Sequence, residues 1–270
     1  MFGKMLSYEI ASRLRADLRQ MGTAIAILVV TVGVVASGVP GLSGTMTMFG
    51  YLMCVAIPVG AAISGMSDYW KTLYGQQGYF TMTLPVSGAV IYWAKASRMI
   101  IEFLIAFALA IGGGITVAWA AAWSQGITLA DYTAGPRSLF ATFSTLVLVV
   151  LFVAWIVSCI ALILQVCAVM SLAAEGRFNH MGFGAVAIGL VLLYIVNQVL
   201  SGVGTFFMPF SMTPDGHFST EVMWTSYRAT LGTDGYPNVW GMGACILVPL
   251  FALFLAGWAS RSIEKRTSLR

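Results

Sequence analysis

The 270-residue chain is 59% hydrophobic and only 9% charged, with a mean hydropathy of +0.88. Soluble domains carry about 25% charged residues, so this composition excludes an ordinary soluble domain and predicts an integral membrane protein. The net charge is only +4. That charge follows membrane topology, as described below, and we expect no nucleic-acid partner.

The first 21 residues predict an amphipathic helix on the membrane surface. Charged side chains separate apolar residues spaced four apart, and basic residues can meet anionic lipid headgroups. The apolar positions are Phe2, Leu6, Ile10, Leu14 and Leu18. A signal peptide is the alternative, but this charged segment contains acids and the apolar run after it is too long.

Five long runs without Asp, Glu, Lys or Arg predict the membrane spans. The run 20–67 has 48 residues, enough for two helices of about 20 residues each. Each of the other four runs accommodates one helix. The sequence therefore predicts an all-α protein with six transmembrane helices. The expected spans are 22–38, 46–66, 98–122, one within 139–172, 183–207 and 240–260.

The basic residues predict the orientation of these spans. Cytoplasmic loops of membrane proteins carry an excess of Lys and Arg. The alternation of spans and loops places 12 of the 14 basic residues on one side. Both termini, the loop 67–97 and the turn at Arg177 are therefore expected in the cytoplasm, and only Arg137 and Arg228 outside. We find no internal repeat and no second soluble domain, so 1–270 is expected to be one domain.

The polar and aromatic loop 67–97 contains a short segment suited to docking a partner. Gly75 and Gly78 permit a turn, an aromatic and apolar stretch follows at 79–84, and Pro85 ends it. Ser87 can then cap the next helix. Exposed apolar clusters mark interaction sites. The residues assigned to this surface are Gly75, Gly78, Tyr79, Phe80, Thr81, Met82, Leu84 and Pro85.

Residues 74–87, YGQQGYFTMTLPVS, resemble the loop between the second and third spans of type-2 ABC exporter permeases. In that family the loop carries a coupling helix that fits a cleft of a separate ATPase. Many relatives carry an acid where this chain has Gln77, so an ionic contact there stays open. The topology is also similar: an interfacial helix at 1–21, six spans, and a large outer loop at 210–238 that in the family often holds short re-entrant helices.

The resemblance implies a permease subunit in the plasma membrane and not an enzyme. Paired with a second permease, identical or related, the chain would form the pathway for an amphiphilic substrate such as a drug, an antimicrobial peptide or a lipid-linked molecule. It contains no G-x-x-x-x-G-K-[ST] phosphate loop. ATP and Mg are therefore expected on the partner ATPase, and no cofactor on this chain.

A few polar residues within or beside the spans are the other candidate sites. Glu102 lies four residues after Arg98, so one helix face can pair them, and a proton-relay role is the alternative. The amides Gln165, Asn197 and Gln198 are expected to bond between helices or to line the pathway. Asp215, His217 and Glu221 lie close together in the outer loop but lack a zinc-type spacing, so no metal site is expected.

Two other functions remain open at the level of sequence. An ion- or proton-coupled carrier would require Glu102, although the small number of charges within the spans argues against it. A non-transporting membrane assembly or sensor protein would use the segment 74–87 to bind something other than an ATPase.

Overall fold

The computed structural model describes residues 1–270 except 76–77, 84, 142, 214, 233–234 and 266–270. The chain forms two compact units. Unit 1 comprises residues 1–86 and 93–139, and unit 2 comprises 87–92 and 140–270. Each unit has its own set of long helices, joined mostly by short connections that keep neighbours in sequence together.

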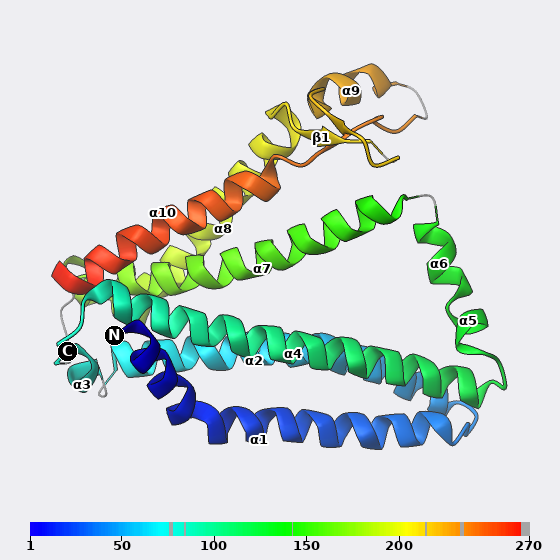
Figure 1. The fold of residues 1–270 in the computed structure, drawn as a ribbon, viewed down its shortest axis with the longest axis horizontal. Helices are drawn as coiled ribbons and strands as arrows, with labels where there is room; N and C mark the ends of the chain where they lie inside the picture. Colours follow the sequence, from blue (N-terminus) through cyan, green and yellow to red (C-terminus); the bar gives the residue numbers. More distant parts are fainter. Residues whose placement is uncertain (76–77, 84, 142, 214, 233–234, 266–270) are drawn as a thin grey trace. The chain divides into compact units, whose positions relative to one another are not determined.

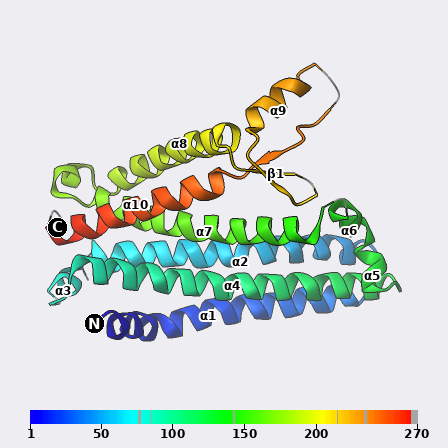
Figure 2. The ribbon, with the colours of Figure 1, turned by 45° about the horizontal axis from the view of Figure 1, so that its top comes forward.

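Unit 1 is built on three long helices that lie side by side (Figures 1 and 2). These are α1 (Phe2–Ala36), α2 (Leu42–Leu73) and α4 (Gly88–Ser124), of which α4 enters the unit at Trp93. The short helix α3 (Gly78–Met82) lies between α2 and α4 in the chain, and α5 (Leu129–Tyr132) and α6 (Ala134–Phe140) follow α4.

Small residues let the helices of unit 1 approach closely. The core joins Leu28 of α1 to residues of α2 and α4 that are mostly small or β-branched: Cys54, Ile57, Ala61, Ala106, Ala110 and Val117. A Cβ placed on Gly50 would lie 2.9 Å from Cγ2 of Val117, so α2 approaches α4 here only because residue 50 is glycine. Such close approach is the usual basis of helix association in membranes.

Unit 2 is built on α7 (Thr145–Ala173), α8 (Phe183–Phe207) and α10 (Ala244–Lys265), and α7 lies against both others. Ser144 caps α7, because its side chain accepts a hydrogen bond from the Val147 amide. The 3-10 helix η1 (Gly176–Met181) joins α7 to α8. The first residues of α4 also belong to this unit, where Tyr92 Oη donates a hydrogen bond of 2.7 Å to the Leu164 carbonyl.

The predicted outer loop 210–238 folds together with the residues that follow it, up to Gly241, into a small head. Its strands β1 (Ser211–Met212), β2 (Phe218–Ser219) and β3 (Trp240–Gly241) form an antiparallel sheet in the order β2-β1-β3. Helix α9 (Met223–Thr230) follows β2. The resemblance implied short re-entrant helices here, whereas the described part of this region combines one eight-residue helix with strands.

Within the part of the chain that the structure describes, six helices are long and apolar enough to cross a membrane: α1, α2, α4, α7, α8 and α10. The expected class, an all-α protein with six membrane-length helices, is confirmed at that level. The predicted surface helix 1–21 and span 22–38 form one continuous helix, α1. Helix α4 begins ten residues before the predicted span. Its charged side chains just before and at the start of that span, Lys95 and Arg98, form buried ion pairs.

Candidate functional site

The predicted docking segment contains a short helix with two exposed aromatic side chains. Tyr79 and Phe80 of α3 are 65% and 74% exposed. Their rings meet edge to face, with centroids 6.1 Å apart. Aromatic side chains bury large apolar areas when they enter an interface. The structure therefore presents on α3 the kind of side chains that dominate protein interfaces.

Hydrogen bonds attach α3 to the end of α2. Thr81 Oγ1 donates to the Thr72 carbonyl oxygen over 2.9 Å, and the Gly78 amide donates to the Gly75 carbonyl over 2.9 Å. Neither glycine has a positive φ angle. Gly75 is required for a different reason: a Cβ there would lie 2.7 Å from the carbonyl oxygen of Lys71. Close approach of the backbone explains this glycine.

The remaining residues of the predicted surface differ in exposure. Met82 is half-buried and Pro85 is exposed, while Leu84 lies outside the described residues. Pro85, Phe80 and Thr81 line a hollow of about 460 Å³, whose other wall is the start of α1 from Met1 to Glu9. The surface around α3 thus includes the first turns of α1, which the sequence did not associate with it.

Buried ion pairs lie directly behind this surface. Lys95 Nζ of α4 lies 2.9 Å from Oε1 of Glu9 on α1, and both side chains are almost fully buried. Lys95 Nζ also donates to the hydroxyl of Thr72 over 2.9 Å. Thr72 therefore contacts both elements: its carbonyl accepts from α3, and its hydroxyl accepts from Lys95 of the buried Lys95–Glu9 pair.

Arg98 connects all three long helices of unit 1. Its guanidinium lies 2.9 Å from Glu102 on α4, 3.3 Å from Asp68 on α2 and 3.4 Å from Asp17 on α1. The predicted pair of Arg98 with Glu102 is present. Planar, always-charged Arg suits contacts with several carboxylates. Arg13 adds contacts of 3.6 Å to both Asp17 and Asp68.

The spacing of charged residues along α1 and α4 is a sequence signal for this network that the prediction of the spans missed. On α1 the charged residues Glu9, Arg13 and Asp17 are spaced four apart, so they share one face. On α4, Lys95, Arg98 and Glu102 recur at intervals of three and four, again on one face. Two charged faces of similar length on helices that flank the first two spans predict pairing between them.

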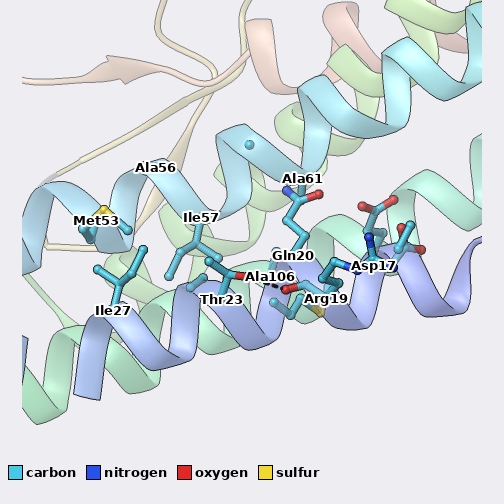
Figure 3. A pocket seen from close by; sticks show the side chains of 15 residues that line it. Asp17, Arg19, Gln20, Thr23, Ile27, Met53, Ala56, Ile57, Ala61 and Ala106 are labelled. Carbon is cyan, nitrogen blue, oxygen red and sulfur yellow. Dashed lines mark hydrogen bonds between the residues drawn. The ribbon is translucent and has the colours of Figure 1, made fainter. Parts of the chain in front are cut away.

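A pocket of about 490 Å³ lies beside the network, between α1, α2 and α4 (Figure 3). Asp17 and Glu102 belong to its lining, and most of the rest is apolar, including Ile27, Met53 and Ile57. In Figure 3 the side chain of Gln20 extends from α1 toward α2, near Ala61. Pockets of this size hold small molecules. The pocket therefore places the buried acid Glu102 and the half-buried acid Asp17 at the edge of an apolar lining.

Of the three amides predicted within the spans, two form a pair between helices and the third is exposed. Asn197 Nδ2 of α8 donates to Gln165 Oε1 of α7 over 2.7 Å. Gln165 Nε2 donates in return to Asn197 Oδ1 and to the Val248 carbonyl of α10, each over 3.2 Å. Gln198 instead is exposed and donates to Tyr194 Oη on its own helix. Gln165 and Asn197 thus join three helices, and Gln198 joins none.

Comparison of this chain with protein-family models, with curated proteins and with solved structures finds no match.

Proposed function

We propose that this chain is the permease subunit of an ATP-driven exporter, and that a separate ATPase docks on α3. One observation carries the proposal. Between two membrane-length helices, the chain forms a short helix that exposes Tyr79 and Phe80 to solvent. Clustered exposed aromatic groups outside the spans suit a protein partner.

The attachment of α3 supports a role in transmitting motion. An element that only binds a partner needs no connection to the membrane helices beyond its chain. Here Thr81 bonds to Thr72, and Thr72 bonds to Lys95, which pairs with Glu9. A displacement of α3 by a partner would therefore reach α1 and α4 through hydrogen-bonded groups.

The other parts of the proposal follow from the resemblance and from the charge distribution. The protein would lie in the plasma membrane, with both termini and α3 in the cytoplasm. Two permease chains would form the pathway for an amphiphilic substrate, and ATP and Mg would bind to the ATPase. The pocket beside Asp17 and Glu102 is apolar and large enough to admit part of such a molecule.

Co-purification of the tagged chain with the ATPase proposed as its partner tests the docking surface. Buried aromatic side chains at interface centres contribute about 2 kcal/mol or more each. We expect Tyr79→Ala with Phe80→Ala to lower the recovered ATPase at least about tenfold. A matched control, Phe218→Ala with Tyr236→Ala, removes two exposed aromatic rings from the head and should change nothing.

Three results would contradict the proposal. Full recovery of the ATPase by the Tyr79→Ala, Phe80→Ala variant would remove α3 as the docking site. Accumulation of substrate by proteoliposomes that contain only this chain, under a proton gradient and dependent on Glu102, would establish the carrier. Binding through α3 to a protein without ATPase activity would favour an assembly or sensor protein.

A further inference from the structure

Two adjoining cavities of opposite character lie on unit 2. The first has a volume of about 340 Å³ and an apolar lining from α7, η1, α8 and α10, including Val169, Phe178, Ile188 and Leu192. The second has a volume of about 290 Å³ and is lined by the last turns of α10. Trp258 lines both cavities, so the apolar groove and the second cavity adjoin at this side chain.

One face of α10 forms the common wall. Phe251, Leu255 and Trp258 line the apolar groove, and Trp258, Arg261, Ser262 and Lys265 line the second cavity. These positions recur at intervals of three and four and so share one helix face. From residue 251 to residue 265 the helix rises about 21 Å. Half of a bilayer with its headgroup region is about 20–22 Å thick, so the face has the length of one leaflet.

Two basic side chains, Arg261 and Lys265, line the second cavity. Among the residues that the structure describes, no carboxylate lies within ion-pair distance of Arg261 or Lys265. The neighbouring acid Glu175 is buried and already partnered. Its Oε1 accepts from Ser262 Oγ over 2.9 Å, and its Oε2 lies 2.8 Å from Arg177 Nε. Glu175 therefore does not neutralise the two basic side chains.

We propose that these cavities together bind one anionic phospholipid. An acyl chain lies in the apolar groove, and the phosphate and headgroup meet Arg261 and Lys265. Trp258 lies at the boundary between the two, where tryptophan is enriched in membrane proteins. Basic pockets beside transmembrane helices bind anionic headgroups in this way. The site does not depend on the permease assignment.

Lipid retention tests the proposal with the full chain. The protein is reconstituted in vesicles of equal parts phosphatidylcholine and phosphatidylglycerol with identical acyl chains, extracted in mild detergent, and analysed by native mass spectrometry. We expect the protein to retain more phosphatidylglycerol than phosphatidylcholine. A basic residue near an anionic surface contributes roughly fivefold in affinity. Arg261→Gln with Lys265→Gln should therefore lower retained phosphatidylglycerol at least roughly tenfold.

A second variant tests the apolar part of the site. Ile188 lines the groove and is half exposed, so Ile188→Trp should fill the groove without entering the core and should lower retention of both lipids. Arg137→Gln with Arg228→Gln removes the same charge from exposed positions elsewhere and should leave retention unchanged.

Three outcomes would overturn the site. The first is equal retention of the two lipids by the unaltered chain, which would indicate ordinary contact with bilayer lipid. The second is undiminished phosphatidylglycerol in the Arg261→Gln, Lys265→Gln variant. The third is unchanged retention in Ile188→Trp, which would mean that the headgroup binds without the groove.

Discussion

The two units differ in the kind of polar group that joins their long helices. Unit 1 buries full charges, with Glu9, Lys95 and Arg98 each nearly inaccessible to solvent. Unit 2 joins its three long helices through a neutral amide pair, Gln165 with Asn197. Charges are expensive in an apolar environment and persist only when paired, whereas amides cost much less.

This difference predicts which substitutions destabilise each unit. An ion pair within a low-dielectric interior depends on every member, because the loss of one leaves its partner charged and unpaired. An amide pair leaves only a neutral group behind when it is broken. We therefore expect substitutions in the buried ion pairs of unit 1 to cost more stability than substitutions in the amide pair of unit 2.

The largest effect should follow from Glu9→Gln. It leaves the buried Lys95 ammonium without the negative charge of its partner, and the loss of one charge of a buried pair costs about 3–5 kcal/mol. Thermal unfolding can be followed with a thiol-reactive fluorophore on Cys54, which is buried in unit 1, after the other cysteines are replaced. A markedly lower midpoint is expected.

Asp131→Asn is the control for that experiment, because it removes the same charge from an exposed position of unit 1. Glu9→Leu with Lys95→Met should recover much of the stability, since a buried pair can be replaced by apolar side chains at little cost. A Glu9→Gln midpoint equal to that of Asp131→Asn would show that the pair contributes nothing to unit 1.

An intermediate effect is expected for Arg98→Lys. A lysine keeps the charge but cannot contact Glu102, Asp68 and Asp17 with one planar group. The loss of one charged hydrogen bond costs about 1.5–3 kcal/mol. The same Cys54 measurement detects it, with Arg15→Lys at an exposed position of α1 as the control. If the two lysine variants unfold at the same temperature, the three-way contact of Arg98 does not stabilise unit 1.

Much of the fold could be predicted because hydropathy is a strong local signal. Long apolar runs favour helices in a membrane, and each of the six predicted spans corresponds to a membrane-length helix. The pair of Arg98 with Glu102 could be predicted because both lie on one helix. The contacts of Lys95 with Glu9 and of Arg98 with Asp68 could not be predicted with the same ease, since they depend on which helices become neighbours.

The small head was not predicted for a related reason. Strands of two residues, such as Ser211–Met212, leave no periodic pattern in a sequence. In β3 the backbone at Gly241 lies so close to the Thr205 carbonyl that any side chain at 241 would collide with it. Glycine marks such an approach only once the fold is known. The docking role of α3 remains a prediction, because exposure of Tyr79 and Phe80 shows an available surface and not its partner.

The smallest effect should follow from breaking the amide pair of unit 2. In a double-mutant cycle of Gln165→Leu and Asn197→Leu, we expect a coupling energy of about 0.6–2 kcal/mol, the usual range for hydrogen bonds between membrane helices. Cys167 is fully buried on α7 and reports the unfolding of unit 2 by the same thiol assay. Gln198→Leu is the matched control, because this neighbouring amide is exposed and bonds only within its own helix. A coupling energy as large as the loss caused by Glu9→Gln would show that neutral and charged pairs stabilise the two units equally.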